Sequence, residues 1–182
     1  VEIGLRGALT GHFVLSTLHT NDAVTSALRL LDMGAASYLV ASALRVIIAQ
    51  RLVRRVCHNC AQAYEMGPQD QAWLKSVTKQ DFSQATFKMG AGCQSCNGSG
   101  YRGRIGVFEI LELDESMIEA MRTGNPQDFA AAAYASPNFT PLAESALTYL
   151  AQGLTTLEEV AKLVEDASDA QIPLMLHQGV EE

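Results

Sequence analysis

The apolar positions at the start of the chain predict a helix followed by a buried strand. Residues 1–9 have the spacing of the last turns of a helix, and Gly11 is expected to end it. The run at 13–18 is almost continuously apolar and carries no charge. Such a run is typical of a strand that is covered on both faces, as in the parallel sheet of an α/β protein.

Two helices are predicted after this strand. Asn21 is expected to cap the first, whose apolar face consists of Val24, Ala27, Leu28 and Leu31. Ser37 is expected to cap the second, whose apolar stripe consists of Val40, Ala43, Leu44, Ile47 and Ile48. The order helix, buried strand, helix, helix is typical of half of an α/β domain.

The middle and the end of the chain follow other patterns. Residues 57–106 are rich in glycine and polar residues, and one short helix is predicted at 68–77. Residues 104–113 alternate like a strand, with Ile105, Val107, Leu111 and Leu113 on one face. From Asp114 onward, capping residues and prolines predict a helical end, and the stretch after Asp166 has no periodicity.

These patterns divide the chain into four regions. The predicted regions are an α/β part at 1–56, a small insertion at 57–106, a strand with a helical end at 107–165, and a flexible tail at 166–182. The insertion is too rich in glycine to build a large core unaided, so it is expected to need another source of stability.

Length and charge exclude several classes of protein. The 182 residues are enough for one sizeable core, and a net charge of −7 leaves no global basic surface for nucleic acid. The longest apolar stretch, at 38–49, contains Arg45 and is too short to cross a bilayer. The first residues do not resemble a signal peptide and lack an initiator methionine, which predicts a fragment or a processed product.

All four cysteines occur in two pairs with the same spacing. Two residues separate Cys57 from Cys60, and two separate Cys93 from Cys96. Each pair can direct both sulfurs at one metal ion, and two pairs complete the tetrahedron that zinc prefers. Three arginines nearby are expected to favour the thiolate form that metals need. They are Arg51, Arg54 and Arg55.

Other interpretations of the cysteine pairs remain open at this point. The pairs could form disulfides or a redox-active dithiol. The 32 residues between Cys60 and Cys93 are more than in common zinc ribbons, although closing the longer loop costs little additional entropy. His58 lies between two cysteines and could replace one as a ligand, but four sulfurs already fill a tetrahedron.

His19 is the main candidate for chemistry outside the cysteine pairs. It follows the predicted strand at 13–18, and ligands of open α/β sheets bind at the carboxyl ends of strands. An imidazole there can contact a phosphate oxygen, with Thr17 and Thr20 as further donors. Position alone favours a simpler interpretation, in which His19 is a loop histidine bonded to a carbonyl. The sequence has no Walker A loop, Walker B strand or nucleophile elbow.

Three segments resemble the ATPases of type II secretion and type IV pilus assembly. Residues 10–23, TGHFVLSTLHTNDA, resemble the His box of that family. Residues 49–57, AQRLVRRVC, together with the cysteine pairs, resemble the tetracysteine zinc subdomain of its secretion and pilus-extension branch. Residues 98–109, GSGYRGRIGVFE, resemble the segment that leaves this subdomain. The resemblance covers 1–165 and is closest to the pilus-assembly members, such as the ATPases of mannose-sensitive haemagglutinin pili.

The resemblance implies a fold, cofactors and partners. The fold would be α/β, namely the C-terminal part of a RecA-like ATPase domain with an inserted tetracysteine zinc subdomain and a helical C-terminal end. His19 would contact the terminal phosphate of the nucleotide, and the complete protein would bind ATP and Mg²⁺. Family members form homohexameric rings in the cytoplasm, peripheral to the inner membrane, and act on an inner-membrane platform protein. Structural zinc would be bound by Cys57, Cys60, Cys93 and Cys96.

The family's Walker A motif, Asp box and Walker B motif precede its His box, and this chain begins after them. We therefore expect the chain alone to be inactive, to bind ATP weakly, and to be a monomer or a weak dimer. An alternative is a free-standing zinc-stabilised module that binds another protein. The acidic balance argues against nucleic acid as its partner, and the buried strand before His19 argues against such a module.

Overall fold

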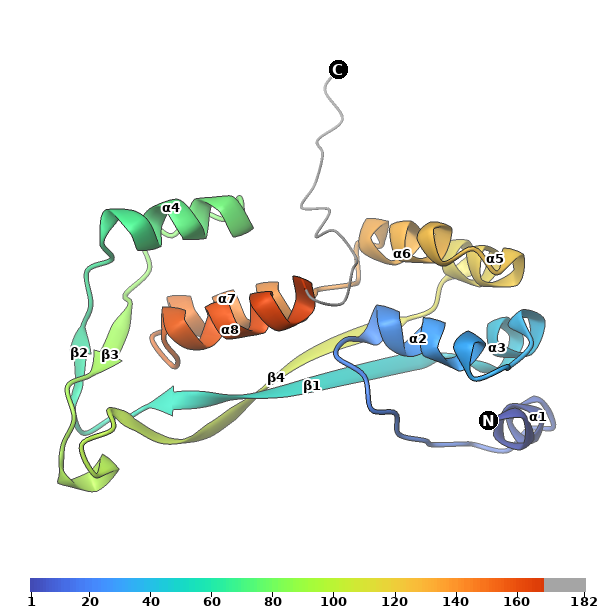
Figure 1. The fold of residues 1–182 in the computed structure, drawn as a ribbon, viewed down its shortest axis with the longest axis horizontal. Helices are drawn as coiled ribbons and strands as arrows, with labels where there is room; N and C mark the ends of the chain where they lie inside the picture. Colours follow the sequence, from blue (N-terminus) through green and yellow to red (C-terminus); the bar gives the residue numbers. More distant parts are fainter. Residues whose placement is uncertain (169–182) are drawn as a thin grey trace, which may run out of the picture. The chain divides into compact units, whose positions relative to one another are not determined.

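The structure is a computed structural model that describes residues 1–168 (Figure 1). The chain divides into two compact units, each built from two stretches of sequence. The first unit consists of residues 1–49 and 109–141, and the second consists of residues 50–108 and the chain from Leu142 onward. The four predicted regions stay predictions. The tail predicted from residue 166 lies, beyond Ser168, outside the described residues.

The first unit is mainly helical. Its helices are α1 (Glu2–Leu9), α2 (Ala23–Asp32), α3 (Ser37–Ala43), α5 (Glu115–Thr123) and α6 (Pro126–Ala135). Helix α5 packs against α3 and α6, while α2 contacts α3 and α6, and α1 contacts α3. The core of this unit is formed by side chains with almost no exposed surface, among them Val24, Val40, Leu111, Met117, Met121 and Phe129.

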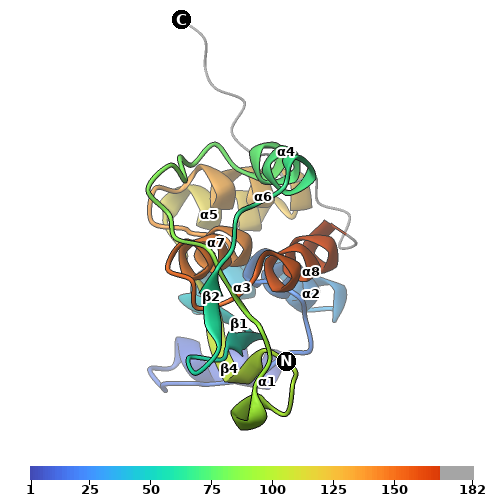
Figure 2. The same ribbon diagram turned by 90° about the vertical axis from the view of Figure 1, so that its left-hand side faces the viewer.

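The second unit contains short strands and three helices among its described residues. Its elements are β2 (Ala61–Ala63), α4 (Pro68–Val77), β3 (Lys88–Gly90), the 3-10 turn η1 (Gln94–Cys96), α7 (Leu142–Ala151) and α8 (Leu157–Ser168). Strands β2 and β3 are antiparallel, with Ala61 opposite Gly90. Helices α7 and α8 lie side by side, as Figure 2 shows, and bury Leu147, Leu150 and Val160.

Strands β1 (Val46–Val56) and β4 (Tyr101–Glu112) pair to form a two-stranded sheet. The predicted alternation of the second strand is confirmed, because Val107 and Leu111 are fully buried while Phe108 and Ile110 are exposed. Helix 68–77 is also confirmed with the predicted bounds, since Pro68 suits the first turn. Among residues 1–168, no helix is both long and apolar enough to cross a bilayer.

The predicted strand at 13–18 is wrong for this structure. The segment has no regular structure, and the Phe13 and Leu15 side chains are 89% and 82% exposed. A strand that is apolar on both faces needs neighbouring strands and a cover on each side. None of the described strands pairs with this segment, so Phe13 and Leu15 stay largely in solvent.

Two details of the following helices also differ from the predictions. Asp22, rather than Asn21, caps α2, because its Oδ1 accepts a hydrogen bond from the Thr25 amide at 2.7 Å. The N-cap of α3 is Ala36, not Ser37. The predicted stripe to Ile48 is wrong as well, since α3 ends at Ala43 and the β-branched residues that follow enter β1.

Candidate functional site

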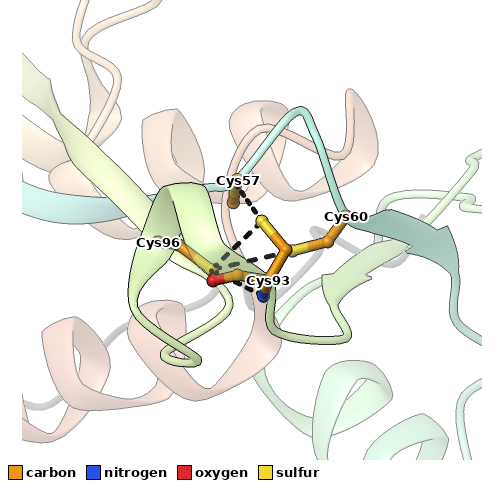
Figure 3. Close-up of side chains that lie close together, drawn as sticks. All are labelled: Cys57, Cys60, Cys93 and Cys96. Carbon is orange, nitrogen blue, oxygen red and sulfur yellow. Dashed lines mark hydrogen bonds between the residues drawn. The ribbon is translucent and has the colours of Figure 1, made fainter.

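The four cysteines converge at one point of the second unit (Figure 3). Cys57 directly follows β1 and Cys60 precedes β2, whereas Cys93 and Cys96 lie at the start and the end of the η1 turn. All four sulfurs lie within 4.8 Å of one another. The predicted grouping of the two pairs is therefore present in the structure.

The distances between the sulfurs match a tetrahedral metal site. The Sγ atoms of Cys57 and Cys93 are 3.9 Å apart, and those of Cys60 and Cys96 are 3.8 Å apart. Within the second pair, the distance from Cys93 Sγ to Cys96 Sγ is 3.7 Å. Four sulfurs placed about 2.3 Å from one ion at tetrahedral angles are about 3.8 Å apart. A disulfide would need about 2.0 Å, so the arrangement favours a metal ion over disulfides.

Backbone hydrogen bonds hold the two cysteine turns together. The Cys57 amide donates to the Gly100 carbonyl at 2.9 Å, and the Ala91 amide donates to the Cys60 carbonyl at 2.9 Å. The second turn closes through the Gly98 amide, which donates to the Cys93 carbonyl at 2.9 Å. Each turn is thus anchored to the stretch of chain that carries the other pair.

Backbone amides also point at the sulfur of Cys96. The Cys93 and Gly100 amides approach Cys96 Sγ to 3.2 Å and 3.3 Å. These hydrogen bonds, led by the one from Cys93, lower the pKa of the Cys96 thiol to about 6 despite burial. Burial, aided by the neighbouring sulfurs, raises the pKa of Cys60 to about 12. Four adjacent thiolates repel one another, and a divalent cation removes this conflict.

Arg54, one of the three arginines expected to favour the thiolates, makes other contacts. Arg54 instead binds the Glu159 carboxylate, with Nε to Oε1 at 2.9 Å, and the Glu158 carboxylate, with Nη2 to Oε1 at 2.9 Å. Its guanidinium also stacks 3.9 Å from the centre of the Tyr101 ring. The amides of the second cysteine turn, rather than arginines, favour the Cys96 thiolate.

His58 is not one of the four grouped ligands, and its side chain is exposed. With four sulfurs converging, a tetrahedral ion has no coordination position left for an imidazole or a water molecule. A closed set of four thiolates is typical of a structural site, whereas catalytic sites keep one position open.

His19 lies in the first unit, apart from the cysteine group in sequence and in unit, and its side chain is exposed. The residues after it are held by a hydrogen-bond network around the start of α2. Thr20 Oγ1 lies 2.5 Å from Ser26 Oγ, which donates to the Asp22 carbonyl at 2.6 Å. The chain is thus fixed immediately after His19, while the segment before it is exposed.

Glu109, which was not among the residues predicted from the sequence, is a carboxylate that is only 3% exposed. Its side chain accepts a hydrogen bond from the amide of Ala23, the first residue of α2. Nearby, burial and the negative charges of Asp22 and Glu109 raise the pKa of Tyr134 to about 12. The signal was available, because Glu109 occupies an inward position of a strand whose other inward residues are apolar.

Comparison with known proteins places this chain among similar sequences. The family model described as "Type II/IV secretion system protein" matches residues 1–162. Relatives include the type IV pilus assembly ATPase PilB of Acinetobacter baylyi, which is 35% identical over 91% of this chain and 28% of its own length. The type II secretion system ATPase E of Vibrio cholerae is 34% identical over 91% of this chain and 32% of its own length.

A third relative, the type IV pilus assembly ATPase PilB of Myxococcus xanthus, is 40% identical over 87% of this chain and 28% of its own length. The chain thus spans about a third or less of the curated relatives it matches. The match to the family model runs through both units and includes His19 and all four cysteines. The chain belongs to the type II/IV secretion system protein family.

Proposed function

We propose that this chain is the part of an ATP-hydrolysing secretion or pilus motor that carries a phosphate-contacting histidine and a structural zinc site. The observation that carries the proposal is the family match over residues 1–162 to proteins named as ATPases. The match extends over both units, which supports this function over a free-standing zinc module.

Zinc is the metal that best suits the cysteine group. Its four ligands would be Cys57, Cys60, Cys93 and Cys96, at sulfur separations that fit a tetrahedron. When bound, zinc supplies folding free energy to the surrounding glycine-rich turns. The amides of Cys93 and Gly100 orient the Cys96 sulfur and stabilise its thiolate form. Backbone hydrogen bonds hold the two cysteine turns together. A closed site of this kind has no part in bond breaking.

His19 is the residue we assign to the nucleotide. Its exposed imidazole can donate a hydrogen bond to a phosphate oxygen. The Ala23 and Thr25 amides at the start of α2 already donate to Glu109 and Asp22, so these two donors are not available to the phosphate.

The remaining parts of the proposal concern the complete protein. We propose a RecA-like ATPase that binds ATP and Mg²⁺, forms a homohexameric ring in the cytoplasm at the inner membrane, and acts on an inner-membrane platform protein. Because the chain spans about a third or less of its relatives, the phosphate-binding loop and metal-binding carboxylates would come from outside these residues. The 182-residue chain alone would then neither hydrolyse ATP nor bind it tightly.

Two measurements test this function. Calorimetric titration of the 182-residue chain with ATP and Mg²⁺ should give no binding in the micromolar range, and micromolar affinity would contradict the assignment of the phosphate-binding loop to other residues. ATP turnover of the complete protein should fall with His19→Ala, while His58→Ala in the exposed cysteine turn serves as the control. Equal turnover of wild type and His19→Ala would overturn the role of His19.

A further inference from the structure

Glu109 is a buried carboxylate whose position calls for an explanation. It lies on β4, where the neighbouring inward side chains Val107 and Leu111 are apolar and fully buried. Removing a carboxylate from water is unfavourable unless it is hydrogen-bonded. It accepts a hydrogen bond from the Ala23 amide, which is one of the donors that an α-helix leaves unsatisfied at its start. The carboxylate therefore holds the first turn of α2.

Asp22 and Glu109 hold this turn from two sides. Asp22 caps α2 from within the same segment, with Oδ1 accepting from Thr25 N at 2.7 Å. Glu109 accepts from the amide of Ala23 in the same turn, although the two residues are 86 positions apart in sequence. The second contact is long-range, so it fixes the helix start relative to β4 within the first unit.

His19 stands only four positions before Ala23, and the chain on its other side is weakly held. Phe13 and Leu15 are 89% and 82% exposed, whereas Thr20 is bonded to Ser26. The position of the imidazole is therefore determined from the α2 side. A contact that fixes the start of α2 therefore also fixes the position of the His19 imidazole relative to a bound ligand.

We propose that Glu109 is a positioning residue for His19, acting through the first turn of α2 and without touching the nucleotide. The inference rests on the proposed function of His19 as a phosphate contact. It adds Glu109 to that function. This residue belongs to β4, which comes after the cysteine turns in sequence, and not to the segment that carries His19. The alternative is a purely structural role, in which Glu109 contributes to folding but not to the placement of His19.

The first test uses hydrogen exchange on the 182-residue chain and needs no nucleotide. Glu109→Ala removes the acceptor, so exchange at Ala23 and at residues 20–22 should accelerate roughly 10- to 100-fold. Glu109→Gln keeps an oxygen at the same distance and should restore exchange to within about threefold of wild type. The Val56 amide, bonded to the Leu154 carbonyl at 2.9 Å in the second unit, serves as the unaffected reference.

Glu109→Asp covers the case in which Glu109→Ala does not fold. It keeps the charge but shortens the side chain by one methylene, so Ala23 should again exchange faster than in wild type. Unchanged exchange at Ala23 in folded Glu109→Ala or Glu109→Asp would overturn the proposal.

The second test is a double-mutant cycle on ATP turnover of the complete protein. His19→Ala and Glu109→Asp should each lower kcat, by about 10- to 100-fold for a misplaced contact, and the double variant should be no slower than His19→Ala alone. Multiplying effects would show that Glu109 acts independently of His19 and would refute positioning. If His19→Ala alone changes nothing, the proposed function of His19 fails, and the exchange experiment still decides whether Glu109 holds the turn.

Discussion

Gly90 and Gly100 pass so close to each other that neither has room for a side chain. A Cβ atom on Gly90 would stand 2.0 Å from the Gly100 carbonyl oxygen, and one on Gly100 would stand 2.5 Å from the Gly90 carbonyl oxygen. Gly100 also has a φ of +76°, which favours glycine. This crossing lies beside the second cysteine pair, since the Gly100 amide points at Cys96 Sγ.

We therefore predict that Gly90→Ala disrupts the cysteine group. The new methyl group meets rigid backbone rather than a movable side chain, so the cost should be roughly 3 kcal/mol. Zinc affinity, measured by competition with a chelator, should fall by about 100-fold. Gly67→Ala is the matched control, because nothing lies within 4 Å of a Cβ there and φ is −67°. Equal zinc affinity in the two variants would show that the close approach of Gly90 and Gly100 is not needed for the cysteine group.

The zinc content of the chain should depend on the four cysteine thiolates and not on the His58 imidazole. Wild type should bind one zinc ion per chain, and Cys93→Ser should lose it because three thiolates leave the tetrahedron incomplete. Elemental analysis by mass spectrometry measures this directly. Removal of zinc should also expose the turns around the cysteines to proteases.

His58→Ala is the control for this experiment. The exposed imidazole lies next to Cys57 in sequence but outside the group of four sulfurs, so the variant should keep its zinc. Loss of zinc from His58→Ala, with retention in Cys93→Ser, would assign a ligand to His58 and overturn the four-sulfur site.

The Arg54–Glu159 pair should make stability depend on pH. Burial alone would raise the pKa of Glu159, but hydrogen bonds from the Arg54 side chain and amide and from Lys162 outweigh it and leave the pKa below its usual 4.5. The folded state therefore binds this proton more weakly than the unfolded state. The stabilisation is fully present above about pH 5 and is lost as the pH falls through the folded pKa.

Urea unfolding at pH 7 and pH 4 measures this effect. Glu159→Gln should lower the free energy of unfolding by about 2 kcal/mol at pH 7 and by less at pH 4. The other ionisable groups are the same in both proteins, so their effects cancel in the difference. Glu65→Gln changes an exposed carboxylate and should keep the wild-type pH dependence. A difference between wild type and Glu159→Gln that is the same at both pH values would rule out this linkage.

Among residues 1–168, the segment before His19 should be the first site of chymotrypsin cleavage. Chymotrypsin should cut after Phe13, whose side chain is 89% exposed in a segment without regular structure. Phe129, which is fully buried in α6, is the internal control and should be cut only after unfolding. Protection of Phe13 under native conditions would mean that the predicted strand at 13–18 forms in solution.

Most predictions that depend on local chemistry succeeded, although the N-caps of α2 and α3 each lie one residue away from the predicted Asn21 and Ser37. Asp114 starts α5 as expected, and its side chain accepts a hydrogen bond from the Met117 amide. Asn125, a capping residue followed by proline, starts α6 and accepts one from the Gln127 amide. The cysteine pairs could be grouped from the sequence because a two-residue spacer fixes the direction of both sulfurs. The alternation along β4 could be predicted as well, since side-chain direction in a strand has a period of two.

Predictions that depend on distant partners failed or were not possible. The run at 13–18 has the composition of a central strand, but a strand also needs neighbours that its own residues cannot supply. The apolar stripe predicted to end at Ile48 extended the helix beyond its true end at Ala43. Ile47 and Ile48 suit either a helix face or a strand, so their pattern did not mark this end. The contact between Glu109 and Ala23 joins residues far apart in sequence, and only the fold brings them together.

The loop between α7 and α8 and the start of α8 cover one edge of β1. The Arg54 amide donates to Glu159 Oε2 at 2.8 Å, its carbonyl accepts from Thr155 Oγ1 at 2.9 Å, and the Val56 amide donates to the Leu154 carbonyl at 2.9 Å. These are the groups through which an exposed strand recruits a strand from another molecule. At the end of β1 beside the cysteines they are already occupied, so the C-terminal helices protect this edge from intermolecular strand addition.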